Sequence, residues 1–234
     1  MELFIEALTN AIHLLLSFDY DTYIVIWLSL KVSFTATLIS TICAIPLALY
    51  ISIKQFRFKH FILSSINTGM AMPPVLAGLF ITILLWRNGI LGRFNLLYTP
   101  QAIIIAQIFL ATPIILGISI SAFQSFSKKF MLQILGLGAT KFQLFMIMIK
   151  ESKLTLLCAI MAGFGAIISE VGASMMVGGN IKGYTRVLTT AIVTETGKGN
   201  FELAMAYGII LLILSFSVNM ILTKIQQKNK TQYE

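Results

Sequence analysis

The chain has 234 residues, of which 57% are hydrophobic and only 11% are charged, and its mean hydropathy is +0.89. A soluble domain of this size needs more polar residues to cover its surface, so the composition excludes that class and indicates a polytopic, all-α protein of the lipid bilayer. The net charge of +8 does not indicate a nucleic-acid partner, because the basic residues lie between apolar runs and form no single patch.

Residues 1–23 form an N-terminal amphipathic segment. At about 100° per residue, the polar side chains from Glu2 to Ser17 fall on one arc, which predicts an amphipathic helix over 1–18. The helix is short for a span, so we expect it to lie in the membrane interface. Packing of this helix against a partner subunit is the alternative.

Five membrane spans are predicted in the domain 24–223, over about 24–53, 60–86, 100–123, 153–177 and 202–223, and a basic tail follows over 224–234. Lys and Arg are concentrated in the loops on one side, which predicts that this side is cytoplasmic and that the N-terminus lies outside. The richer side carries Lys54, Arg57, Lys59, Lys128, Lys129, Lys141, Lys150, Lys153, Lys224, Lys228 and Lys230; the other side carries Arg87, Arg93, Lys182, Arg186 and Lys198.

Four prolines, Pro46, Pro73, Pro74 and Pro113, fall inside the predicted spans. Each removes a backbone donor and collides with the carbonyl four residues earlier, so each predicts a kink. The Pro73-Pro74 pair favours a second span that lines a pathway through the membrane. A plain kinked bundle is the alternative interpretation.

The predicted cytoplasmic loop over about 124–152 is unusually apolar. It contains SFSKKFMLQILGLGATKFQLFMIMIKESK, with a helical hydrophobic period that Gly136 and Gly138 interrupt. A surface this hydrophobic has to be buried, and a cytoplasmic partner protein is the natural candidate.

Within this loop, LGLGATKFQLF resembles the coupling-helix loop of ABC importer permeases, which docks into a cleft of an ATPase subunit. WLSLKVSFTATLISTICAIPLAL and MAMPPVLAGL resemble the first two helices of molybdate- and tungstate-type permeases. ISEVGASMMVGGNIKGYTRVLTTAIVTETGKGNF is similar to the tungstate branch, so the resemblance covers about 24–223. It implies the transmembrane domain of a type I ABC importer and assigns the coupling role to Gly136, Gly138, Ala139, Thr140, Lys141, Phe142 and Phe145.

The resemblance also implies the partners. The chain has no Gly-x-x-x-x-Gly-Lys-Ser/Thr phosphate loop, so ATP and Mg²⁺ are expected on a separate ATPase. We expect no cofactor, metal site or catalytic residue on this chain. The expected assembly is a permease homodimer with two ATPase subunits and an extracytoplasmic oxyanion-binding protein, in the inner (cytoplasmic) membrane. Tungstate is the expected substrate, with molybdate or sulfate as alternatives.

Two further groups of residues are candidates for function. Pro73, Pro74, Glu170 and Gly172 are pathway or gate candidates. Glu170 is the one acid well inside a predicted span, and a carboxylate repels an anion, so we expect a structural or gate role with a hydrogen bond to a neighbouring helix. In the outer loop 178–200, Lys182, Tyr184, Arg186 and Lys198 are candidates for docking the binding protein or steering the anion; simple solvated charges are the alternative.

Two other classes compete with this interpretation. A secondary transporter would need inverted repeats and intramembrane coupling residues, and neither is apparent in the sequence. A membrane enzyme would need clustered acids, nucleophiles or metal ligands, whereas the histidines are only His13 and His60.

Overall fold

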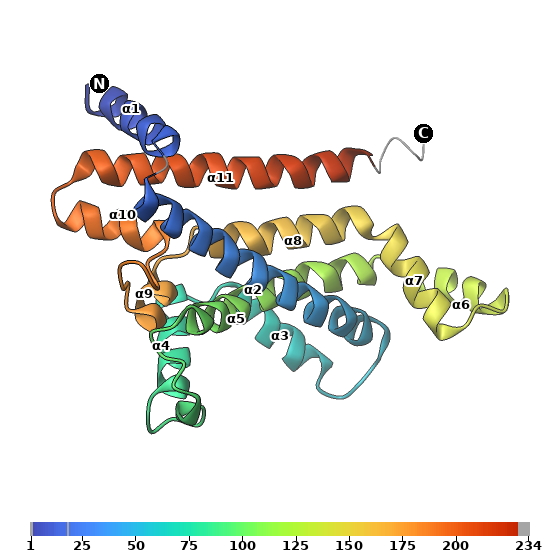
Figure 1. The fold of residues 1–234 in the computed structure, drawn as a ribbon. Helices are drawn as coiled ribbons and strands as arrows, with labels where there is room; N and C mark the ends of the chain where they lie inside the picture. The colour runs from blue at the N-terminus through green and yellow to red at the C-terminus, as the bar shows by residue number, and fades with distance from the viewer. Residues whose placement is uncertain (1, 18, 229–234) are drawn as a thin grey trace.

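The computed structural model describes residues 2–17 and 19–228, and the regular secondary structure in these ranges is helical (Figure 1). Within these ranges, three helices are long and apolar enough to cross a membrane: α2 (Tyr20–Ile53), α5 (Pro100–Gln124) and α11 (Phe201–Lys228). Two broken pairs complete up to five spans. In the first pair, α3 (Lys59–Met70) and α4 (Pro74–Leu85) meet at 105°; in the second, α8 (Lys153–Ile168) and α9 (Gly172–Gly178) meet at 59°.

Shorter elements lie at the two ends of the bundle. The described part of the chain adds α1 (Glu2–Leu16), the 3-10 turn η1 (Gly92–Phe94), α6 (Lys128–Gly136), α7 (Lys141–Glu151) and α10 (Leu188–Gly197). In Figure 1, α6 and α7 lie at one end of the long helices, while α1, α9 and α10 lie at the other. Most of the predicted outer loop 178–200 is therefore the ordered helix α10 and its turns. Part of the predicted tail continues α11, and residues 229–234 lie outside the described residues.

The prediction that all four prolines lie inside helices is wrong for two of them. Pro46 and Pro113 lie within α2 and α5, whereas Pro73 caps the N-terminus of α4 and Pro74 is its first residue. The first positions of a helix have no intrahelical partner for their N–H groups, so a proline there costs no hydrogen bond. The Pro-Pro pair thus starts a new helix in a new direction.

The core lies where α2, α5 and α8 pack together. Small side chains that are fully buried, among them Ala36, Ala44 and Ala48 of α2 and Ala106 and Ala111 of α5, let these helices approach closely. Close packing of small residues is the usual basis of helix association in a membrane. This rigid bundle supports the elements at both ends.

Helix α1 packs on α11 of the same chain, near the end that carries α10 (Figure 1). Ala7 and Ala11 are buried in this contact, and the Tyr23 hydroxyl of α2 donates to the Leu15 carbonyl at 2.9 Å. The larger apolar side chains Leu8 and Ile12 remain exposed. A position of α1 in the membrane interface stays a prediction.

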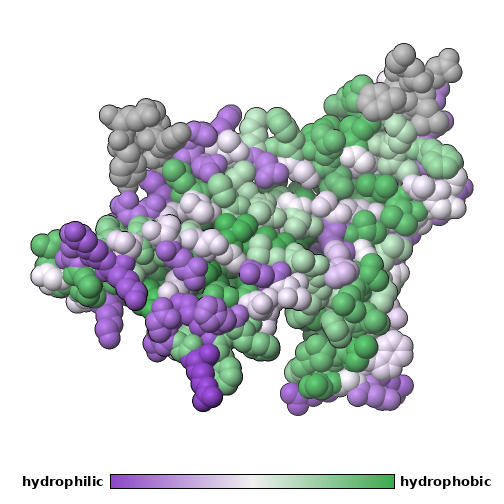
Figure 2. Space-filling view, turned by 180° about the vertical axis from the view of Figure 1, so that it is seen from behind, coloured by the Kyte–Doolittle hydropathy of each residue, from purple (hydrophilic) through white to green (hydrophobic). Residues whose placement is uncertain are grey.

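Helix α4 projects away from the bundle as an arm (Figure 1). Figure 2 shows this arm, at the lower right, as a mainly hydrophobic surface with hydrophilic residues at its tip. Its exposed apolar side chains include Val75, Phe80, Ile83 and Trp86. The arm is held to the bundle by α9, which packs along its other face.

Candidate functional site

The predicted coupling loop forms two short helices joined by a tight turn. Gly136 ends α6, and Gly138 has a φ of +87°, a conformation that favours glycine. Thr140 caps α7: its hydroxyl accepts from the Gln143 N–H at 3.2 Å, and the Gln143 side chain accepts from the Thr140 N–H at 2.7 Å. This reciprocal capping box fixes the start of α7 directly after the turn.

A groove of about 480 Å³ lies along the turn and the outer face of α7. Of the predicted coupling residues, Gly138, Ala139 and Phe142 line it. Phe145 is only partly buried, packs towards the core and stacks with Phe142 at 6.2 Å between ring centroids. The groove is also lined by residues that the sequence interpretation did not single out, Leu137, Gln143, Met146, Ile147 and Lys150.

This end of the molecule exposes large apolar side chains. Leu137 is 88% exposed, and Phe142 and Leu132 are 69% and 68% exposed. Burial of each such side chain contributes about 1.5–3 kcal/mol before the entropic cost of association, so this surface suits a docked partner. The opposite face of α7 is anchored by Leu144 and Met148, which are buried, so the groove is held on a firm support.

The two helix breaks lie side by side, which brings the pathway or gate candidates together. A Cβ added at Gly172 would lie 2.5 Å from Val75 Cγ2, next to Pro74. A Cβ at Gly78 of α4 would lie 2.6 Å from the Ala173 Cα of α9. The glycines therefore permit a backbone-to-backbone contact between α4 and α9, the second halves of the two broken spans.

Glu170 lies in the second break and is 6% exposed. Its carboxylate accepts from the Ala173 N–H at 2.7 Å, and from the Ser174 N–H and hydroxyl at 3.2 Å each. The Thr189 hydroxyl of α10 donates to the Glu170 carbonyl at 2.9 Å. The bond to a neighbouring helix is thus made by the main chain, while the side chain caps α9.

Gln107 of α5 supports the other side of this break. Its side-chain amide donates to the Ile167 carbonyl at the end of α8, at 3.2 Å, and Gln107 is 2% exposed. A broken helix in a membrane is tolerated where protein groups satisfy the freed backbone atoms. The sequence interpretation missed Gln107, although a single amide in the apolar run of α5 was a usable signal.

The predicted outer-loop cations form a partly neutralised cluster. Lys182, Arg186 and Lys198 line one pocket of about 290 Å³, with Asp21 and Glu195 among the other lining residues. Lys182 pairs with Asp21 at 2.6 Å, and Lys198 pairs with Glu195 at 2.7 Å. Tyr184 is half exposed and is not among the lining residues of this pocket.

These contacts also perturb the titratable groups of this cluster. Hydrogen bonds from the Asn200 amide and from Lys198 hold the pKa of the Glu195 carboxyl below its ordinary value. The hydrogen bond to Asp21 raises the pKa of Lys182. Arg186 donates to the Asn180 side chain at 3.2 Å. Much of the positive charge of this loop is therefore balanced within the chain, which weakens its long-range field.

A helical membrane bundle with broken spans and an exposed, apolar helix pair at one end matches the architecture of the transmembrane subunit of a type I ABC importer. A chain of the MetNI methionine ABC transporter in an inward-facing conformation has the same fold, with a TM-score of 0.71 at 16% identity over 87% of this chain and 93% of that chain. The chain belongs to the family of binding-protein-dependent transport system inner membrane components, which it matches over residues 14–231.

The names of two relatives state tungstate as the substrate. The tungstate uptake system permease protein of Peptoclostridium acidaminophilum is 40% identical over 230 residues, which is 97% of this chain and 100% of that protein. The protein of the same name from Campylobacter jejuni is 36% identical over 173 residues, 74% of this chain and 72% of that one. The chain is accordingly a multi-pass permease subunit that works in an ABC transporter. Family membership decides against a secondary transporter and a membrane enzyme.

Proposed function

We propose that this chain is the permease of a tungstate importer in the inner membrane. The observation that carries the substrate is the 40% identity to a tungstate uptake permease over nearly the full length of both chains. Molybdate is the alternative, because the two oxyanions share size, shape and charge. The protein that captures the anion outside the membrane makes that choice.

The proposed assembly contains two copies of the chain, two ATPase subunits and one extracytoplasmic oxyanion-binding protein. Each ATPase carries ATP and Mg²⁺ and docks at the apolar groove of α6 and α7. Leu137 and Phe142 supply the contact area, and Gly138 supplies the turn that presents them. With the ATPase docked at α6 and α7, that end of the bundle is cytoplasmic. The N-terminus and the cluster of Lys182 and Arg186 are then outside, where the binding protein docks.

Reconstituted transport tests the proposal. The permease, its ATPase and its binding protein are placed in proteoliposomes, and uptake of tungstate, molybdate and sulfate is measured with and without ATP. We expect ATP-dependent tungstate uptake that depends on the binding protein and that sulfate does not inhibit. Uptake of molybdate with no uptake of tungstate would contradict tungstate as the substrate. Uptake without the ATPase would contradict ATP-driven transport.

A further inference from the structure

We infer that the exposed face of α3 is the wall that this chain contributes to the anion path, and that a basic pocket at the start of α3 is its cytoplasmic mouth. The inference rests on the proposed function and deepens it, because it names the residues that the anion passes. The polar residues of this face, called the polar strip below, are Ser64, Ser65, Asn67 and Thr68, and all four are exposed.

The first observation is the two-faced character of α3. Ile62, Leu63 and Ile66 pack on the core of the bundle. The polar strip lies on the opposite side, because positions 64, 65, 67 and 68 share one arc of the helix, and the exposed Phe61 lies on the same arc. Polar side chains in membrane segments face the interior of an assembly or a water-filled cavity, since lipid offers them no hydrogen bonds. The polar strip is therefore expected to face water between two copies of the chain.

The second observation is the chemistry of the polar strip. The Ser65 hydroxyl donates to the Phe61 carbonyl and the Thr68 hydroxyl donates to the Ser64 carbonyl, both at 2.9 Å. These bonds keep the hydroxyls satisfied at rest, and rotation about χ1 frees them to donate elsewhere. Among the described residues, the Asn67 amide has no hydrogen-bond partner. Hydroxyl and amide donors without fixed charge suit a weakly held, moving anion.

The third observation is the basic pocket at the predicted cytoplasmic end of α3. It has a volume of about 490 Å³, and its lining includes Lys59, His60, Gln124 and Lys128. None of its lining residues, all of them in the described part of the chain, is acidic. His60 of this lining lies one helical turn before Ser64, so the pocket lies next to the start of the polar strip.

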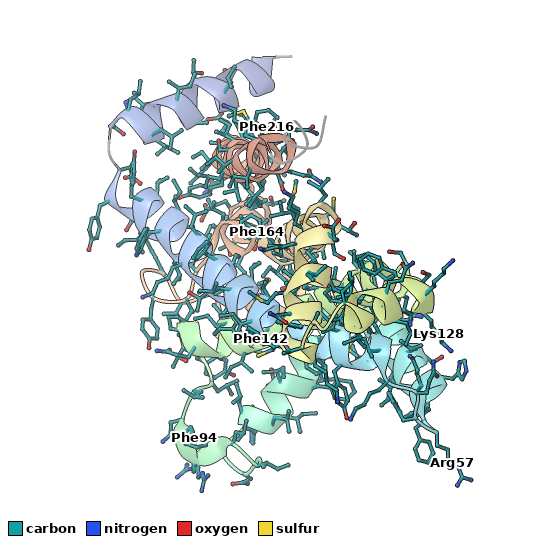
Figure 3. The ribbon with its side chains drawn as sticks, turned by 90° about the vertical axis from the view of Figure 1, so that its right-hand side faces the viewer. Arg57, Phe94, Lys128, Phe142, Phe164 and Phe216 are labelled. Carbon is teal, nitrogen blue, oxygen red and sulfur yellow. The ribbon has the colours of Figure 1, made fainter. Side chains whose placement is uncertain are left out.

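Two of the basic groups differ in how they are held. The Lys59 ammonium is fixed, since it donates to the Ser52 and Lys54 carbonyls at 3.0 and 2.9 Å. Lys128 is exposed at the start of α6, and Figure 3 shows it on the same corner of the molecule as Arg57 of the α2–α3 turn. Concentrated positive charge at this mouth would attract an anion arriving from the path and pass it on to solvent.

Thiol accessibility in the assembled transporter tests the inference. Cys43 and Cys158 are replaced by alanine, and Ser65→Cys is compared with Ser217→Cys on α11. The two serines share one hydrogen-bond pattern, because Ser217 also donates to the carbonyl four residues earlier, that of Ile213 at 2.7 Å; Ser217 is half-buried, whereas Ser65 is exposed. An anionic, membrane-impermeant methanethiosulfonate is added from the cytoplasmic side. We expect it to modify Ser65→Cys and block tungstate uptake, and to leave Ser217→Cys unmodified.

The charge of the reagent tests the basic mouth. An anionic reagent should modify Ser65→Cys at least about tenfold faster than a cationic reagent of the same size, because a basic cleft concentrates anions. Adding Lys128→Gln should reduce this preference, and the neighbouring control Lys129→Gln, which is not among the residues that line the pocket, should leave it unchanged. The inference would be overturned if Ser65→Cys is not modified, or if the ratio of the anionic to the cationic modification rate is the same with and without Lys128→Gln.

The outcomes separate this inference from the proposed function. If the cysteine-free parent takes up tungstate but the reagent does not reach Ser65→Cys, the inference about the polar strip is wrong and the proposed function still holds. If Ser65→Cys reacts faster with the anionic reagent but the transporter carries another anion, tungstate is the wrong substrate and the inference about the polar strip still holds.

Discussion

The turn of the coupling loop offers a sharp test, because two nearby glycines differ in backbone conformation. A Cβ at Gly136 or at Gly138 would meet no atom within 4 Å, but only Gly138 has a positive φ, +87°. An alanine at Gly138 is strained by about 1–2 kcal/mol in this conformation. It can relax when the loop is free but has to restore the turn to dock. We therefore expect Gly138→Ala to weaken ATPase binding by about 5- to 30-fold.

The assay is a titration of labelled ATPase onto the permease in lipid nanodiscs. ATP hydrolysis per anion transported is measured separately in proteoliposomes. Gly136→Ala is the control; it should bind with unchanged affinity because alanine is favoured in a helix. Gly138→Asn should recover part of the loss, since asparagine tolerates the left-handed conformation. Equal affinities for the two alanine variants would show that the docked turn does not keep this φ, and the coupling geometry would have to be abandoned.

The other predictions concern the helix breaks and the outer surface. Gly78→Ala should lower the stability of the bundle by about 1–3 kcal/mol through overpacking against α9, whereas Gly165→Ala, with open space around its Cβ, should not; equal melting temperatures would contradict the α4–α9 contact. Glu170→Ala should lose uptake and about 1–3 kcal/mol of stability, because buried N–H groups of α9 lose their acceptor. Glu170→Gln keeps only one of the two accepting oxygens and should lose less stability than Glu170→Ala; similar stability of the two variants and the parent would refute the capping role. The pKa of Glu195 is lowered in the folded state, so its contribution to stability is present above its unfolded pKa and is lost as the pH falls through the folded pKa. Glu195→Gln should therefore reduce the loss of unfolding free energy at acid pH. An unchanged dependence of the unfolding free energy on pH would count against the Glu195 contacts.

Much of the fold could be predicted from the sequence, because a membrane imposes simple rules on composition and length. The long apolar runs identify α2, α5 and α11, and the glycine-rich apolar loop identifies α6 and α7. Lipid-facing helices need no special pattern beyond hydrophobicity and length, so their existence is easy to predict. Their breaks are harder, because a proline at the first position of a helix and one in its interior look alike in a sequence.

The contacts across the breaks could not be predicted, because they join residues far apart in the chain. Gly78 meets Ala173, and Gln107 meets Ile167, and no local pattern specifies either pair. The outer cations illustrate a related difficulty. Lys182 counts as a free charge in a sequence, but its pairing with Asp21 depends on how α2 and the loop before α10 come together.

The hydrogen bonds of Glu170 make a buried carboxylate compatible with the proposed anion path. Both oxygens of Glu170 accept hydrogen bonds from the first turn of α9, so its negative charge is balanced by the N–H groups and dipole of that helix. A carboxylate used in this way closes a backbone break and presents little field to a passing anion. The groups left to meet the anion are neutral donors, and the exposed face of α3 supplies them. Separation of these roles explains why an acid at the break between α8 and α9 is compatible with oxyanion transport: the acid holds the broken helix, and the hydroxyl and amide groups of another helix form the wall of the path.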